Sequence, residues 1–365
     1  ISTKTGSAPY KYISIGLGVL LIAGSFLLWI NTTPEPALET YNKSIAVLPF
    51  DNYSTAEEDA FFSDGVTEII TANLAKIKDL KVISRTSVMV YKNTIKSIKE
   101  IGRELDVAHV LEGSVQRIGD NIRITGQLIE TETDKHLWAE SYDGTLDNFF
   151  TFQSDIAFKI AGELHSTITA KANELITDIP TKNMKAWRNY LKGLKYFRKS
   201  NNREDLEYAN HYFELAYKED STFIAPLTMS ANTDLLFYWL GKEPKDKMVE
   251  LSKRKIDKAK SINPRSAQVL NAEGTYYYYG FRDYEKALDY YTRAMEMEPG
   301  NSEILSNIGF IQRRLGLVKQ SLNTHEKSLR MNPNDPILIQ NMIQSYKYLR
   351  NYHKSLDFAQ RITKL

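Results

Sequence analysis

The chain begins with a long apolar run. Residues 13–30, ISIGLGVLLIAGSFLLWI, contain no charged side chain. A helix of about 20 apolar residues crosses the hydrocarbon core of a bilayer. This pattern predicts one transmembrane helix over residues 13–31, between a juxtamembrane segment at 1–12 and a linker at 32–43.

Two other interpretations of the run are weaker. A signal peptide has a shorter apolar region, of about 7–15 residues, and a cleavage site with small residues, which is missing here. A buried core helix fits poorly with Pro34 and Pro36, which lead into a polar stretch. Lys4 and Lys11 precede the run, and positive charge favours the cytoplasmic side. We therefore expect a single-pass protein of the inner membrane whose C-terminal region is extracytoplasmic.

From residue 44 the pattern changes to short apolar runs separated by amphipathic segments. Residues 44–50 and 80–86 are apolar and β-prone, which predicts two buried strands. Apolar side chains recur at helical spacing over about residues 56–77 and 95–107, which predicts two helices packed by one face.

Alternating apolar and polar positions then predict a hairpin and one more strand. A turn signal at residues 119–121 separates two alternating runs, and residues 136–142 form the next strand. A helix over about 146–172 follows. The order β-α-β-α-β-β-β-α predicts an α/β domain with a mixed sheet over residues 44–175.

The second half of the chain contains an internal repeat. Pro264, Pro299 and Pro333 are 35 and 34 residues apart, and each follows an apolar-periodic helix. This period is typical of tetratricopeptide repeats, whose units are pairs of helices. We expect an all-α superhelix of about five units over residues 183–365. Its last unit has no polar capping helix, so either the chain is cut there or a partner covers it.

Small residues mark the crossing of the two helices in a unit. Gly274 aligns with Gly309, and Ala287 aligns with Ser321. A larger side chain at Gly309 or Ala287 would overfill the crossing. The interval from Gly274 to Ala287 is one residue longer than that from Gly309 to Ser321, which predicts an extra residue in the turn at 280–283.

Composition excludes several kinds of chemistry. The protein has no Cys, so it has no disulfide, zinc thiolate or Cys nucleophile. No metal-binding spacing, phosphate loop or nucleophile elbow occurs in the sequence. The α/β region contains polar groups that are candidates for an active site assembled from distant positions: Asp51, Asp64, Glu68, Arg85, Glu112, His136 and Glu140. The alternative is helix capping for Asp64, a solvent-facing strand position for Glu112 and Glu140, and a surface or structural role for His136. We expect no catalytic residue, metal or cofactor in this chain.

A tyrosine-rich stretch in the third unit combines packing with a candidate binding surface. Tyr277, Tyr284 and Tyr291 are expected between the helices, whereas Tyr278 and Tyr279 belong to the concave face. The residues predicted to line this groove are Asn271, Tyr278, Tyr279, Ser306, Phe310, Arg313, Arg314, Gln340 and Lys347. Aromatic rings with cationic side chains suit an extended peptide or an acidic tail. The alternative is that the arginines are merely solvated.

Charge gives little support for nucleic-acid binding. The net charge is only +2, so the protein has no strong overall positive field. A basic run between Lys253 and Lys260 lies in a helical pattern that turns much of it outward, without interleaved aromatic residues. We therefore expect no direct nucleic-acid binding by this chain.

Several blocks of the middle region resemble the TolB-like amino-terminal domain. They are SIAVLPFDN, FFSDGVTEII, LKVISRTSV and the long block from IGRELDV to HLWAESYD, in the family's order, over about residues 44–170. In bacterial signalling proteins such a domain often lies between a membrane helix and a tetratricopeptide array. A nucleotide cyclase or a winged-helix domain often precedes that membrane helix. Because the first residue is Ile1, we expect the chain to be a piece of a longer protein or a processed one.

Together these features predict the non-catalytic sensory and protein-interaction region of a membrane-anchored bacterial signalling or transcription-regulatory protein. The repeat array would bind a peptide or protein partner. An alternative is the regulatory half of an adenylate cyclase whose catalytic domain lies upstream. A third possibility is a scaffold for envelope assembly. Whether the full-length protein is an enzyme is left open by these residues.

Overall fold

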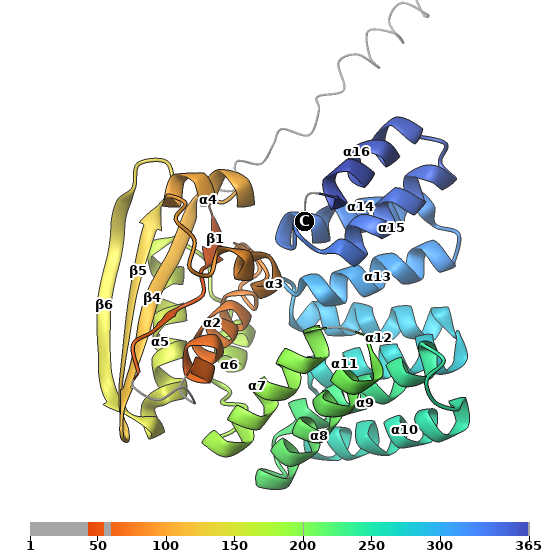
Figure 1. Cartoon of the computed structure of the whole chain (residues 1–365), viewed down its shortest axis with the longest axis horizontal. Helices are drawn as coiled ribbons and strands as arrows, with labels where there is room; N and C mark the ends of the chain where they lie inside the picture. Colours follow the sequence, from red (N-terminus) through yellow and green to blue (C-terminus); the bar gives the residue numbers. More distant parts are fainter. Residues whose placement is uncertain (1–42, 55–59, 200, 364–365) are drawn as a thin grey trace, which may run out of the picture. The chain divides into compact units, whose positions relative to one another are not determined.

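The α/β region is built on one mixed sheet (Figure 1). The computed structural model describes residues 43–54, 60–199 and 201–363. Within them the strand order is β3-β1-β4-β5-β6, and the short β2 pairs with β4. Strand β1 is parallel to β3 and β4, whereas β4, β5 and β6 are antiparallel. The strands are β1 (Ser44–Val47), β2 (Asp51–Asn52), β3 (Lys81–Val82), β4 (His109–Ile118), β5 (Asn121–Glu130) and β6 (Lys135–Thr145).

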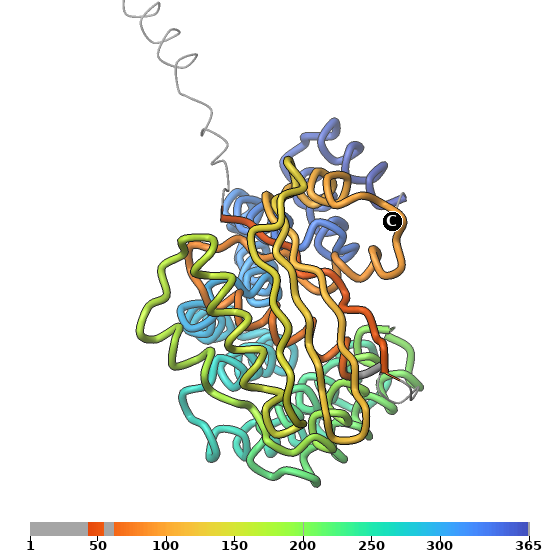
Figure 2. The backbone as a smooth tube through the Cα atoms, turned by 90° about the vertical axis from the view of Figure 1, so that its left-hand side faces the viewer, coloured from red at the N-terminus to blue at the C-terminus, as the bar shows by residue number. Residues whose placement is uncertain are grey.

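Alternation along β1 divides the apolar side chains between two faces of the sheet. Ile45 and Val47 belong to the core that contains α2 and α5, while Ala46 and Leu48 belong to the core beneath α3 and α4. Figure 2 shows β4–β6 in front, and α4 packs against the start of β4, where Val110 shares a core with Ile101. The helices of this region are α2 (Ala60–Leu74), α3 (Arg85–Val88), α4 (Ile98–Leu105), α5 (Phe149–Glu163) and α6 (Ala170–Thr177).

The predicted order of elements is confirmed for the larger elements, but β2 and α3 are additional and several boundaries differ. The helix predicted over 146–172 is two helices, because His165 takes a left-handed backbone conformation (φ 49°) and Thr169 caps α6. The helix predicted over 95–107 starts at Ile98, where Ser97 and Glu100 form a capping box. Ile95 is consequently fully exposed instead of packed.

Ten helices follow as five consecutive pairs in the described residues, and this is a tetratricopeptide-like architecture (Figure 1). The pairs are α7 (Met184–Lys199) with α8 (Arg203–Glu219), α9 (Ile224–Trp239) with α10 (Lys245–Ile262), α11 (Ala267–Thr275) with α12 (Tyr284–Met297), α13 (Ser302–Arg314) with α14 (Val318–Met331), and α15 (Pro336–Tyr348) with α16 (Tyr352–Ile362). The division into domains at 44–175 and 183–365 stays a prediction.

The predicted close crossing of paired helices is confirmed. A Cβ atom added at Gly274 would lie 2.6 Å from the ring of Tyr291, and one added at Gly309 would lie 2.3 Å from the ring of His325. Ala287 is fully buried at the same kind of position. Each glycine therefore makes room for a ring from the second helix of its unit.

The extra residue of the third unit lies in a helix rather than in the predicted turn. The segment η4 (Tyr276–Phe281) is a π-helix that extends α11. Arg282 ends it in a left-handed conformation and follows Gly274 by eight residues, whereas Gly316 follows Gly309 by seven. The turn has the same length in both units, and the π-helix absorbs the insertion.

No helix in the described residues is both long enough and apolar enough to span a membrane. The predicted transmembrane helix at 13–31 lies outside the described residues.

Candidate partner-binding surface on the repeat array

The predicted groove residues differ widely in exposure. Arg314, Gln340 and Lys347 are exposed. Asn271, Tyr279, Phe310 and Arg313 are half-buried. Seven of the nine predicted residues are therefore at least partly exposed, on the first helices of three consecutive units, and their role in binding stays a prediction.

Two of the predicted groove residues lie beneath the surface. Tyr278 is only 6 % exposed and belongs to the apolar core of the third and fourth units, because the π-helix turns it inward. Ser306 is also buried, and its hydroxyl donates to the Ser302 carbonyl at 2.9 Å. The Ser328 hydroxyl lies 2.7 Å from it. Both residues therefore support the surface from inside.

An aromatic shelf missed by the sequence analysis adjoins the predicted tyrosines. The indole of Trp239, at the end of α9, stacks on the ring of Tyr279 with centroids 4.7 Å apart and planes 17° from parallel. Its centroid lies 5.6 Å from that of Tyr278. Farther along the array, Tyr348 is 71 % exposed. The shelf thus offers flat apolar area beside the arginines.

The helix ends seen in the structure show that Trp239 and Tyr348 occupy equivalent positions in their units. Trp239, Arg314 and Tyr348 each precede by two positions the residue that ends their helix in a left-handed conformation. Equivalent positions in stacked units lie on one face. We call the set formed by these residues and their neighbours the partner surface: Trp239, Tyr279, Arg313, Arg314, Lys347 and Tyr348.

The cations of the partner surface have no acidic partner in the described part of the chain. No carboxylate oxygen there lies within 4.0 Å of Arg313, Arg314 or Lys347. The Tyr278 side chain raises the pKa of the Arg314 guanidinium. Desolvation and the neighbouring Arg314 lower the pKa of Arg313. Both guanidinium groups remain charged at neutral pH, so the surface is cationic.

The first unit shows what an arginine at this position holds. Arg198 follows Gly193 by five residues, as Arg314 follows Gly309. Its guanidinium donates to both carboxylate oxygens of Glu68 on α2, at 2.8 and 2.9 Å. The position equivalent to Arg314 in the first unit therefore already binds a carboxylate, that of Glu68 on a neighbouring helix.

A second arginine completes an ion-pair cluster around Glu68. Arg85 lies 3.3 Å from the Glu68 carboxylate and 3.7 Å from that of Asp64. Desolvation raises the pKa of Glu68, but Arg198 and Arg85 outweigh it, so the net pKa lies below the ordinary value. Glu68 therefore stays ionised and joins α2, α3 and α7.

The structure brings together three of the seven polar groups weighed as parts of an active site, namely Asp64, Glu68 and Arg85. The other four lie on strands. The Glu112 carboxylate accepts from the Gln127 amide, and the Glu140 carboxylate accepts from Tyr142 at 3.0 Å. Asp51 and His136 are exposed. Among the described residues no cluster of His, Asp and Glu is arranged to hold a metal ion.

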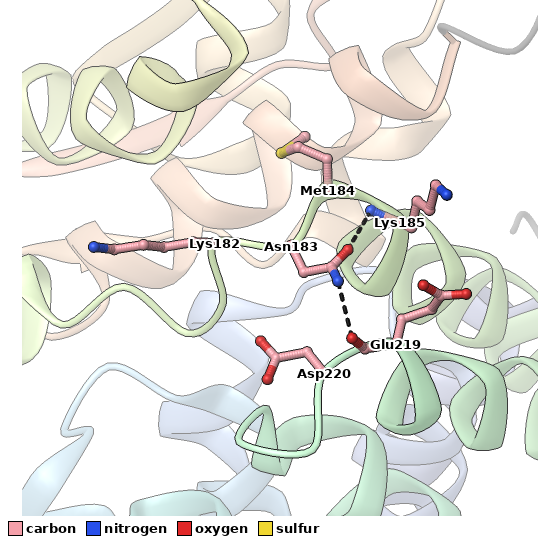
Figure 3. Close-up of a pocket in the computed structure, with 6 residues that line it drawn as sticks. All are labelled: Lys182, Asn183, Met184, Lys185, Glu219 and Asp220. Carbon is pink, nitrogen blue, oxygen red and sulfur yellow. Dashed lines mark hydrogen bonds between the residues drawn. The ribbon is translucent and has the colours of Figure 1, made fainter.

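An open hollow lies between the start of α7 and the end of α8 (Figure 3). Asn183 spans it: its amide donates to the Glu219 carbonyl at 2.9 Å, and its side-chain oxygen accepts from the Lys185 amide at 2.9 Å. Lys182 and Lys185 point away from each other (Figure 3). Since the polar groups bond one another and do not converge, we assign no chemistry to this hollow.

Comparison with known proteins finds two similarities in sequence. Residues 41–158 match the model of the HilA/YgeH-like transcriptional regulator, second domain. A protein of Rhizobium meliloti (strain 1021) named "Putative adenylate cyclase 3" is 43 % identical over 145 residues, which are 40 % of this chain. The chain spans only 24 % of the length of that relative.

Solved structures with similar helical arrays match about half of the chain. A Pseudomonas aeruginosa PilF structure is 21 % identical over 49 % of this chain and 76 % of its own, with a TM-score of 0.38. YrrB, described as a TPR protein with an unusual peptide-binding site, is 16 % identical over 54 % of this chain and 93 % of its own, with a TM-score of 0.31. MamA is 14 % identical over 49 % and 91 %, with a TM-score of 0.32. These TM-scores are low, so the assignment of a repeat architecture is based on the five helix pairs in the described part of this chain and not on the matches.

Proposed function

We propose that this chain is the non-catalytic, partner-binding region of a bacterial signalling or transcription-regulatory protein, and that its array binds a peptide or protein through the partner surface. One observation carries the proposal. Arg198 and Arg314 occupy equivalent positions, yet Arg198 holds the Glu68 carboxylate while Arg314 faces no carboxylate among the described residues. An external acidic group would complete the second site as Glu68 completes the first.

The chemistry of the surface describes the partner. Two adjacent guanidinium groups suit an acidic side chain or a C-terminal carboxylate, because both offer two acceptor oxygens. The stacked rings of Trp239 and Tyr279 suit an apolar or aromatic side chain beside it. We expect an extended acidic peptide with at least one apolar residue.

The wider setting of the protein is part of the proposal. The α/β region would be a TolB-like domain, anchored in the inner membrane by residues 13–31 and displayed outside the cytoplasm. An effector domain before the membrane helix would respond to partner binding. Supporting this, the matched region is shared with a transcriptional-regulator family and with a relative named as a cyclase.

The specific alternative is that the chain is the regulatory half of an adenylate cyclase. The 43 % identity to the Rhizobium meliloti protein favours it, since that protein is much longer than the matched part. Sequencing the gene upstream of Ile1 separates the two. A cyclase domain there supports the alternative, and a winged-helix domain supports a transcription regulator.

We do not expect this chain to bind nucleic acid directly. In α10, Lys253 pairs with Asp257 and Arg254 pairs with Glu250 one turn away, the latter at 2.9 Å. These pairs are exposed and lie along one helix. Acidic residues of the same helix therefore neutralise part of the charge of the basic run between Lys253 and Lys260.

Charge reversal tests the partner surface. The full chain is applied to an array of short random peptides with free C-terminal carboxylates, and the R313E/R314E variant is compared with wild type. Because hydrogen bonds to charged groups contribute about 1.5–3 kcal/mol, we expect binding to acidic peptides to fall by about tenfold or more.

The matched control is K253E/R254E, which makes the same change in charge on α10. It should bind acidic peptides as wild type does. Equal loss in both variants would show a general effect of net charge, and unchanged binding by R313E/R314E would end the proposal.

A further inference from the structure

The α/β region is attached to the repeat array at two separate places. At the first, helix α2 packs on α7 of the first unit. A Cβ atom at Gly65 would lie 2.9 Å from Leu191 and 3.0 Å from the indole nitrogen of Trp187. The same apolar core contains Ile70 of α2 and Phe213 of α8. We call this the apolar contact, and it joins the sheet and the first unit into one core.

At the second place the α3 end of the α/β region meets the loop between α14 and α15. The hydroxyls of Ser84 and Ser87 both donate to the side-chain oxygen of Asn332, each at 2.6 Å. The Asn334 amide donates to the Ser87 hydroxyl at 3.1 Å. The Ser84 amide donates to the Met331 carbonyl at 2.7 Å.

One more backbone bond joins the α/β region to the array, one repeat unit earlier. The amide of Gly300, in the loop between α12 and α13, donates to the carbonyl of Ala75 at 2.9 Å. A Cβ atom at Gly300 would lie 2.4 Å from that carbonyl oxygen, so only glycine allows the approach. We call these five hydrogen bonds together the polar contact.

The two contacts differ in what holds them. No apolar core among the described residues contains side chains of both the α/β region and helices α11–α16. Hydrogen bonds between protein groups are exchanged for bonds to water when a contact opens, so the net free energy of each is small. When buried apolar side chains are exposed to water, by contrast, no equivalent interaction with water replaces the lost burial. The polar contact is therefore the one that opens first.

The polar contact is also connected to the partner surface. Gly300 lies two residues before α13, and Asn334 lies two residues before α15. The opposite ends of these helices carry Arg314 and Tyr348. The polar contact and the partner surface therefore lie at opposite ends of the same two helices.

We infer that the polar contact is a latch: it opens while the apolar contact stays closed, and its opening changes how a partner binds to the partner surface. The regulatory part of this inference rests on the proposed function. The opening itself does not, because it is a property of the free chain.

Hydrogen exchange on the full chain tests the opening. The amides of Ser84 and Gly300 report on the latch, and the amides of Ile70 and Leu191 report on helices α2 and α7, which form the apolar contact. We expect the latch amides to exchange at least about tenfold faster, through an opening that denaturant hardly affects. Equal exchange rates at the two contacts would overturn the inference.

A disulfide provides the matched closed state. The chain has no Cys, so the S87C/N334C variant introduces a single possible pair at positions already in hydrogen-bond contact. Oxidation should slow hydrogen exchange at the amides of Ser84 and Gly300, and reduction of the disulfide should return exchange to its faster rate. An unchanged rate with the disulfide formed would contradict the latch.

Removal of the hydrogen bonds gives the open state without new cysteines. The S84A/S87A/N332A variant should exchange faster at Gly300 while Ile70 is unaffected. As a control, T177A and S261A remove hydroxyls that bond carbonyls of their own helices and should leave both reporters unchanged. Equal acceleration at Ile70 would show general destabilisation and overturn the latch.

The two proposals fail in different experiments. If the latch amides open early but R313E/R314E binds acidic peptides as wild type does, the proposed function falls and the latch stands. If peptide binding depends on the arginines but oxidised and reduced S87C/N334C bind equally, the regulatory role of the latch falls.

Discussion

The α/β region meets the array at two places whose chemistry differs. At the apolar contact, Trp187 is buried among rings and the core runs from the sheet into the first unit. At the polar contact, serines and asparagines of two loops meet through hydrogen bonds. Both contacts join segments that are far apart in the chain: Gly65 lies against Trp187 at the first, and Ser84 bonds to Asn332, 248 positions away, at the second. The two contacts therefore differ in chemistry, and we expect the first to set stability and the second to set motion.

The largest expected effect is at the apolar contact. Trp187→Ala removes a buried ring whose centroid lies 5.6 Å from that of Phe150, and loss of a buried aromatic side chain costs about 3–5 kcal/mol. We expect chemical denaturation, followed by circular dichroism, to show a lower midpoint for the sheet and the first unit together.

Trp239→Ala is the control of the same residue type. Trp239 is half-buried on the partner surface, so its removal should cost clearly less stability. A loss at Trp239 as large as that at Trp187 would break the comparison between a core contact and a surface shelf.

The next effect is a pH dependence within the array. His325 is fully buried, and burial lowers the pKa of its imidazole to about 4. Its Nδ1 lies 3.5 Å from the Ser321 hydroxyl, the Phe310 ring packs on it, and the charge of Arg313 opposes protonation. The folded protein therefore keeps this imidazole neutral at pH values where the unfolded chain protonates it.

The sign of the effect follows from this difference. The unfolded chain binds a proton near pH 6.5, so stability is complete above that pH and falls as the pH drops toward 4. The slope is about 1.4 kcal/mol per pH unit. The variant His325→Phe places a phenyl ring there, as Phe213 does in the first unit. The free energy of unfolding, measured between pH 7 and 5, should then lose the part of its pH dependence that comes from His325. An equal slope in the variant would contradict the assignment.

Local patterns in the sequence predict much of the fold. The order of strands and helices and the pairing of repeat helices follow from apolar periodicity, and the crossing at Gly309 follows from the alignment of repeats. The π-helix at Tyr276–Phe281 does not follow, because an insertion of one residue fits a turn or a helix equally well in a pattern.

The contacts between distant segments are beyond such patterns. Glu68 and Arg85 each appeared as possible site residues, but nothing local places Arg198, 130 positions from Glu68, against them. The same holds for Asn332 at the polar contact. Trp239 and Tyr348 had a signal in the repeat positions, which became visible only once the helix ends were known.

A smaller effect is expected for the ion pair beside the apolar contact. Glu68→Gln removes the charge held by Arg198 and Arg85, and we expect a loss of about 1–2 kcal/mol at pH 7, since Arg198 is partly exposed. The pKa of Glu68 is lowered by folding, so its contribution is present above about pH 4.5 and disappears at lower pH. Wild type and variant should therefore converge in acid denaturation, and a constant difference down to pH 2 would refute the role of the charge.

The smallest effect on global stability should come from Gly300→Ala, and it is the most informative for the latch. The new methyl group would approach the Ala75 carbonyl oxygen to 2.4 Å, so the hydrogen bond from residue 300 must break. Because the apolar contact still holds the region, we expect a loss of only about 0.5–1.5 kcal/mol in denaturation. Exchange at the Ser84 amide should nevertheless accelerate, because we infer that the bonds of the polar contact open together. Gly162→Ala in α5, where a Cβ atom meets nothing within 4 Å, is the control and should leave that amide unchanged. Unchanged exchange at Ser84 in Gly300→Ala would mean that these bonds open independently, and the two places of attachment would then no longer divide into one core and one latch.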